Sequence, residues 1–180
     1  MYADNTLTPK EAARLCALGV LADGQMAYLE LAISVRYFMD RVLGPSLDVL
    51  GASIELLTYE GLVKTENTDG DSMLSITDTG RDALHTLLTA NIRHGATDIN
   101  KLIVALKFRF MHLLDAEDKK LQAQALVEST ETELARLLDL RGHLNTDQGF
   151  LLGWLERQIS ELKSHAEWLR TFKGGLSESS

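Results

Sequence analysis

The stretch that most constrains the fold is residues 46–84, where a helical pattern gives way to short strands and then returns. The helical part is apolar and stops at Gly61, and Leu62 and Val63 follow at once. Glycine takes the left-handed conformation that commonly ends a helix, and Leu62 then anchors the next strand in the core. The chain therefore changes from helix to strand at Gly61.

A polar turn cluster lies inside this stretch at 67–71 and separates two segments, 64–67 and 73–76, that are typical of paired strands. Thr77 follows and suits the N-cap of a further helix. Helix, hairpin and helix in this order predict the second half of a winged helix, a fold whose commonest use is to read DNA.

The preceding residues supply the helices that this fold requires. Thr8, Pro9 and Glu11 form a capping-box start for a helix over 8–22. A second helix, over 26–43, is indicated by apolar residues near helical spacing, namely Leu29, Ile33, Tyr37 and Val42. Gly44 and Pro45 break this helix, and Ser46 is expected to cap a third over 46–60, which would be the recognition helix.

The remainder of the chain is helical in pattern, with segments over 77–91, 98–113 and 116–140 and a final helix after a break at 141–146. We expect a winged-helix domain over 1–92, a helical dimerisation domain over 93–173 and a disordered tail over 174–180. The fold class is thus mainly α with a small β-hairpin wing: a winged helix-turn-helix followed by an antiparallel helical dimerisation domain.

The last helix carries apolar side chains at alternating steps of three and four residues, which is the spacing of a coiled-coil seam. Two consecutive helices with such seams expose too much apolar surface for a monomer, so we expect a second copy to cover them. The expected homodimer interface consists of Leu152, Leu155, Ile159, Leu162 and Leu169.

No pattern in the sequence indicates catalysis. The five histidines lack metal-ligand spacing, Cys16 has no cysteine partner, and the glycines form no phosphate-binding loop. We therefore expect no enzyme activity, no metal and no cofactor. A single cysteine and the absence of a signal peptide or an apolar membrane span favour the cytoplasm, without a membrane partner.

The charge distribution bears on DNA binding. The net charge is −8; residues 1–90 hold 6 Lys or Arg and 13 Asp or Glu, whereas residues 91–180 hold 12 and 13. Because Lys and Arg neutralise phosphates, the acidic balance of residues 1–90 weighs against DNA binding. The net charge does not exclude it, since a dimer needs only a local basic surface. The residues expected to contact DNA are Arg36, Arg41, Ser46, Ser53 and Lys64.

Trp154 and Trp168 lie two heptads apart on the last helix, beside its leucine seam. Tryptophans in this position fill a helix interface, the interpretation we favour, or they sandwich a small aromatic ligand.

With these elements in place, the chain resembles the PadR family of bacterial transcription regulators, in particular its virulence-activator branch. The resemblance rests on 15–21, on 28–31, on the two segments around the wing (57–63 and 76–81), and on a long C-terminal helix closing with Glu167-Trp168-Leu169. It implies a DNA-binding winged helix and a C-terminal dimerisation domain. Three departures stand out: Gly51 lies where the family usually has a tyrosine, the wing turn lacks Arg and Lys, and so does the recognition helix.

The sequence thus predicts a homodimeric regulator of transcription that binds specific double-stranded DNA. The alternative is a winged-helix dimer that has lost DNA binding and recognises a protein instead.

Overall fold

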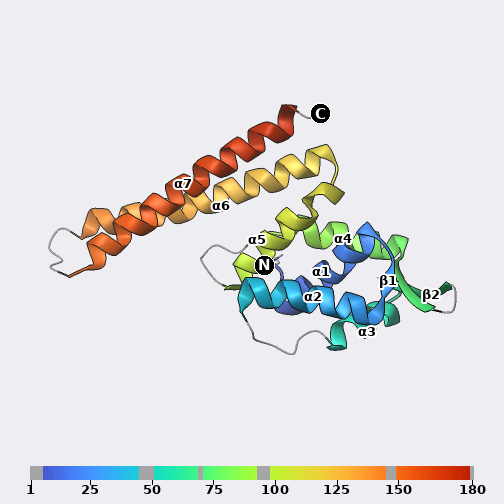
Figure 1. Cartoon of the computed structure of the whole chain (residues 1–180). Helices are drawn as coiled ribbons and strands as arrows, with labels where there is room; N and C mark the ends of the chain where they lie inside the picture. The colour runs from blue at the N-terminus through green and yellow to red at the C-terminus, as the bar shows by residue number, and fades with distance from the viewer. Residues whose placement is uncertain (1–5, 45–50, 69–70, 93–97, 145–148, 179–180) are drawn as a thin grey trace, which may run out of the picture. The chain divides into compact units, whose positions relative to one another are not determined.

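The computed structural model describes residues 6–44, 51–68, 71–92, 98–144 and 149–178. The chain forms two compact units: the first contains residues 1–91 and 96–114, and the second contains the remaining residues up to 180. Figure 1 shows the helices and strands by label. In chain order the elements are α1 (Pro9–Asp23), β1 (Met26–Ala27), α2 (Tyr28–Leu43), α3 (Gly51–Tyr59), β2 (Val63–Thr68), β3 (Asp71–Ile76), α4 (Asp78–Thr89), α5 (Asp98–Phe110), the short 3-10 helix η1 (Met111–Leu113), α6 (Ala116–His143) and α7 (Leu151–Glu178).

Helix α1 lies at the centre of the first unit and contacts α2, α3, α4 and α5. Its start is the predicted capping box: the Thr8 side chain accepts from the Glu11 backbone N–H, and Glu11 accepts from the Thr8 backbone N–H. From Ala12 to Leu21 all but Arg14 are buried, because helices surround α1 on several sides. The helix is therefore the core element on which the others are placed.

The sheet has three antiparallel strands in the order β1-β3-β2. Strands β2 and β3 form the predicted hairpin, with Val63 opposite Ile76 and Thr68 opposite Asp71. Strand β1 was not predicted, and it takes the first two residues of the helix expected over 26–43; Met26 lies opposite Leu74. Two residues carry no alternation of their own, so only the pairing with β3 defines this strand.

The apolar residues that predicted helix α2 from the sequence are not the ones that this helix buries. Leu31, Val35 and Met39 are buried. Leu29, Ile33 and Tyr37 are exposed by 59% or more. Both sets recur every four residues, so the spacing identifies the helix without telling which face packs inward.

Helix α5 packs in the first unit, against α1 and α2, although its residues were expected in the dimerisation domain. The side chain of Phe110 is fully buried, and a Cβ at Gly19 of α1 would lie 2.7 Å from its ring. Gly19 therefore allows α5 to approach α1 closely. The boundary between the units follows Leu114 rather than residue 92.

Lys107 of α5 is buried, with 1% of its surface exposed. Its Nζ donates hydrogen bonds to the backbone oxygens of Leu88, at 2.5 Å, and Ala90, at 2.8 Å. These carbonyls lie at the C-terminal end of α4, where no further helical turn supplies N–H donors. The ammonium of Lys107 therefore provides their hydrogen bonds. Burial lowers the pKa of Lys107 to about 8.

The second unit is an antiparallel pair formed by α6 and α7 (Figure 1). Helix α7 continues to Glu178, whereas the sequence predicted a disordered tail from Gly174. Extending an existing helix adds one hydrogen bond for each residue that is fixed, so the two glycines at 174 and 175 do not end it. The sequence predicts a capping box for α7 at Asn145 and Gln148, and both residues lie outside the described part of the chain.

Candidate nucleic-acid interface

The joint between α3 and the wing is built by the two motifs that the sequence singled out. Gly61 has a φ of 73°, in the left-handed region, and the backbone N–H of Leu62 donates to the Leu57 oxygen at 2.9 Å. The Thr77 hydroxyl donates towards the backbone oxygens of Gly61, at 2.8 Å, and Leu62, at 3.0 Å. Thr77, which follows the wing, is therefore hydrogen-bonded to the backbone that follows α3.

Gly80 allows this joint to close. Its backbone N–H donates to the Thr77 hydroxyl at 3.0 Å, so Thr77 caps α4 as predicted. A Cβ on Gly80 would lie 2.0 Å from the backbone oxygen of Leu62. Because that oxygen belongs to the backbone and cannot swing away, only glycine fits here without displacing the first residues of the wing.

Helix α3 is anchored by its apolar face. Ile54 and Leu57 are buried, and the described outer residues include Leu56 and Tyr59, which are 47% and 90% exposed. Arg14 of α1 forms an ion pair with Glu60 at the end of α3. The exposed face of α3 thus presents apolar and acidic side chains, and α3 contains no Lys or Arg.

The predicted phosphate ligands lie on α2 and on the wing. Arg36 and Arg41 of α2 are exposed, and the Arg41 guanidinium lies 4.8 Å from the ring centre of Tyr37. Lys64 of β2 is exposed, and its Nζ lies 2.5 Å from a carboxylate oxygen of Glu66. Solvent screens such a pair strongly, so a phosphate can compete with Glu66 for the lysine.

The two predicted serines are described incompletely. Ser46, the predicted cap of the recognition helix, lies outside the described residues. Ser53 belongs to the first turns of α3, and its side chain lies outside the described part of the chain.

The side chains expected at the dimer interface lie mainly inside the second unit. Leu155, Ile159 and Leu169 are buried on α7, which packs along α6, and Leu162 is half-buried. Leu152 is 43% exposed. The seam that the sequence revealed is thus used within one chain, between α6 and α7.

The described residues contain no group of three or more His, Cys, Asp or Glu side chains that could hold a metal ion. Among the same residues, no helix is both long and apolar enough to cross a membrane. Cys16 is buried in α1, and burial raises the pKa of its thiol to about 12.

The first unit thus has the architecture of a winged helix, and a pair of antiparallel helices follows it in the chain. Residues 2–173 match a family described as "Putative AphA-like transcriptional regulator", and the chain belongs to this family. The match confirms the PadR-like resemblance that the residues around the wing and the closing Glu167-Trp168-Leu169 indicated. The protein is a transcriptional regulator. No curated protein matches its sequence.

Solved structures that match the chain include PadR of Bacillus subtilis, which is 18% identical, with a TM-score of 0.39 over 96% of this chain and 98% of that chain. The same protein in complex with operator DNA is 19% identical, with a TM-score of 0.37 over 91% and 98%. The PadR-like transcriptional regulator BC1756 of Bacillus cereus is 18% identical, with a TM-score of 0.40 over 93% and 99%.

Proposed function

We propose that the protein regulates transcription in the cytoplasm by binding specific double-stranded DNA as a homodimer, and that it is not an enzyme. The observation that carries the proposal is the joint of Gly61, Thr77 and Gly80, which holds the wing at a fixed place beside the end of α3. A helix and a wing presented together on a rigid core form a shape that enters and flanks a DNA groove.

We assign two kinds of DNA contact to the winged-helix domain. Arg36, Arg41 and Lys64 bind phosphates and position the protein on the duplex without reading its sequence. Ser46 and Ser53, near the start of the recognition helix, are the residues assigned to phosphates at the helix terminus and to base edges.

A salt titration tests this assignment. Each phosphate that is neutralised contributes about −0.9 to the slope of log affinity against log salt concentration, so three such side chains in each subunit give a homodimer a slope of about −5. We expect Arg41→Ala and Lys64→Ala each to weaken binding on every DNA sequence and to reduce the magnitude of the slope by about 1.8, because a homodimer loses two phosphate contacts with each substitution. Lys163→Ala, on the exposed surface of α7, is the matched control.

Glu66 offers a test in the opposite direction. Because its carboxylate pairs with Lys64 in the free protein, Glu66→Gln should tighten DNA binding, and it should do so by less once Lys64 is alanine. If Arg41→Ala and Lys64→Ala together leave binding to a true operator unchanged, the assigned phosphate contacts are wrong.

The second candidate function is recognition of a protein by a winged helix that no longer binds DNA. It is favoured by the exposed face of α3, where Leu56 and Tyr59 are accessible and no Lys or Arg is present. In that case DNA would not bind even at low salt, and Tyr59→Ala would abolish binding of the protein partner.

A further inference from the structure

A cavity of about 290 Å³ lies within the first unit, between the end of α1, one face of α4 and η1. Its residues on α4 include positions 81, 84, 85 and 88, whose spacing places them on the same face of the helix. A water molecule occupies ~30 Å³ in the liquid, so the cavity has the volume of about ten waters. It is therefore large enough for a small organic molecule.

Most of the cavity lining is aliphatic. It is supplied by Ala22 of α1, Leu84 and Leu88 of α4, and Leu113 and Leu114 at the end of η1. Leu84, Leu88 and Leu114 are buried, so they form the inner part of the cavity. Among the described residues, no Phe, Tyr or Trp lines it. The apolar part of a ligand would therefore contact alkyl groups rather than stack on aromatic rings.

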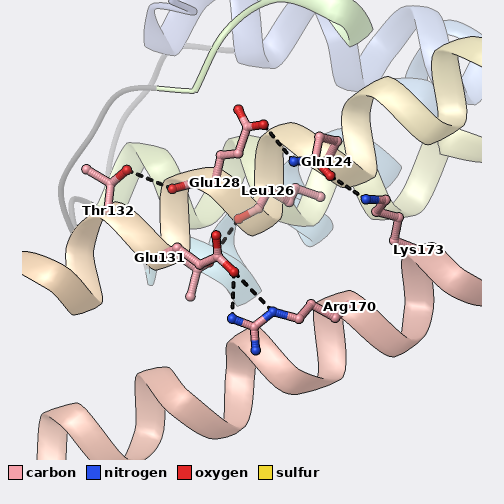
Figure 2. A network of polar contacts seen from close by, with 8 residues as sticks. Gln124, Leu126, Glu128, Glu131, Thr132, Arg170 and Lys173 are labelled. Carbon is pink, nitrogen blue, oxygen red and sulfur yellow. Dashed lines mark hydrogen bonds and ion pairs between the residues drawn. The ribbon is translucent and has the colours of Figure 1, made fainter.

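The polar lining residues are Arg81, Asp82 and His85. All three are exposed, so they lie where the cavity opens to solvent. Elsewhere in the chain an arginine pairs with a carboxylate: Arg170 donates two hydrogen bonds to Glu131, at 2.5 and 3.0 Å (Figure 2). Within the described parts of the chain, by contrast, the guanidinium of Arg81 forms no ion pair. Its donors are available to a ligand.

The position of Arg81 favours an anionic ligand. It follows the first three residues of α4, where the backbone N–H groups and the helix dipole create a positive potential. A guanidinium binds a carboxylate through two parallel hydrogen bonds. Asp82 adjoins Arg81, and its negative charge disfavours a ligand that carries two charges, such as a phosphate monoester. A single carboxylate is therefore the head group that suits this opening.

We propose that the cavity binds a small aliphatic monocarboxylate, with the carboxylate on Arg81 and the alkyl chain along the leucines. The site includes none of the DNA contacts assigned above, so it adds a second ligand to the proposed function. Both parts of the ligand are needed, because the charged opening and the aliphatic interior belong to one cavity.

The cavity adjoins the point at which the chain leaves the first unit. Leu114 is the last residue of that unit, and Asp115 caps α6. Beside the lining, Nε2 of His112 lies 3.0 Å from Oδ1 of Asp23, and this contact joins η1 to the end of α1. A ligand that contacts α1, α4 and η1 together stabilises this junction, so its binding should raise the melting temperature of the protein.

Calorimetric titration of the full-length protein without DNA tests the chemical class of the ligand. Each methylene that leaves water tightens binding about fourfold, so octanoate should bind roughly 15-fold more tightly than hexanoate. Octan-1-ol has the same chain and no charge, and it should bind about tenfold more weakly than octanoate or weaker still. Octylamine should bind no better than the alcohol, because its ammonium would face Arg81. An affinity that does not depend on chain length, or an amine that binds more tightly than the acid, would overturn the proposal.

Arg81→Gln tests the contact with the carboxylate. It should weaken octanoate binding about tenfold and leave octan-1-ol binding unchanged, because it removes the charge without altering the aliphatic lining. Arg136→Gln, on the exposed surface of α6, makes the same charge change away from the cavity and should leave both affinities unchanged. Equal weakening of the acid and the alcohol by Arg81→Gln would contradict the assigned ion pair.

Two substitutions test the cavity itself. Ala22→Leu fills part of it and should weaken the acid and the alcohol alike, whereas Leu113→Ala enlarges it and should shift the preference towards decanoate. Circular dichroism checks that each variant is folded, and if Ala22→Leu is not, Leu113→Ala alone provides the test. Octanoate binding that neither substitution affects would exclude the cavity, and its loss in Trp168→Ala would place the acid on the exposed surface of α7 instead. Because DNA is absent from every titration, failure of DNA binding does not affect the result.

Discussion

The buried amine of Lys107 makes the stability of the first unit depend on pH in a predictable direction. In the unfolded chain the lysine has a pKa near 10.5, whereas burial lowers its pKa to about 8 in the folded protein. Between these values the unfolded state binds more protons, so the free energy of unfolding rises with pH. For these two values, the rise between pH 7 and pH 9.5 is about 2 kcal/mol.

The comparison with Lys107→Met isolates this contribution. Methionine has a similar length and cannot titrate, although it leaves the carbonyls of Leu88 and Ala90 without their donor. Cys16 acts in the opposite direction, because its pKa of about 12 in the folded state makes folding less favourable above pH 9. Cys16 is present in both proteins, so its effect cancels in the difference.

Urea unfolding at pH 7 and at pH 9.5 provides the assay. We expect the stability difference between the unaltered protein and Lys107→Met to shift by about 2 kcal/mol in favour of the unaltered protein at the higher pH. An equal difference at the two pH values would show that the lysine does not titrate in a buried site, and would refute the reasoning.

Three further outcomes follow from the packing. Gly80→Ala should lower the free energy of unfolding by about 1–3 kcal/mol, because the added Cβ meets the backbone oxygen of Leu62. Gly24→Ala, with open space around it, should be nearly neutral, and equal effects of the two substitutions in urea unfolding would contradict the close approach at Gly80. Leu155→Asp should unfold the α6–α7 pair, since burying an unpaired carboxylate costs several kcal/mol, while the exposed Leu152→Asp should keep its helix content by circular dichroism. The thiol of Cys16 should react with a maleimide no faster than the protein opens, and rapid labelling at pH 8 under native conditions would show that it is accessible.

Features determined by neighbouring residues were predicted well from the sequence. The capping box of Thr8 and Glu11, the helix end at Gly61 and the cap at Thr77 all depend on a few adjacent residues, and each is confirmed. The hairpin is confirmed for the same reason, since a polar turn separates two short strands.

Features determined by distant parts of the chain were not predictable in the same way. Strand β1 exists because Met26 lies beside Leu74, and no pattern in 26–27 reveals this pairing. Nothing in the sequence around Lys107 indicates that its side chain is buried against the end of α4.

The leucine seam of α7 shows the same limit. The spacing of the leucine seam identifies a face of α7 that packs, and only the structure shows that α7 uses this face to pack along α6 within one chain. Periodicity identifies a face that packs, but it does not tell which molecule supplies the partner surface.

The most direct test of the central proposal is footprinting on DNA selected from a genomic library by the full-length protein. A homodimer with two winged helices should protect two related half-sites in inverted orientation, spaced by one helical turn of about 34 Å or a multiple of it. Tyr59→Ala should retain the footprint, whereas Arg41→Ala with Lys64→Ala should remove it. Failure to bind any fragment at low salt, or a single unsymmetrical protected site, would contradict the proposal that this winged helix reads DNA as a dimer.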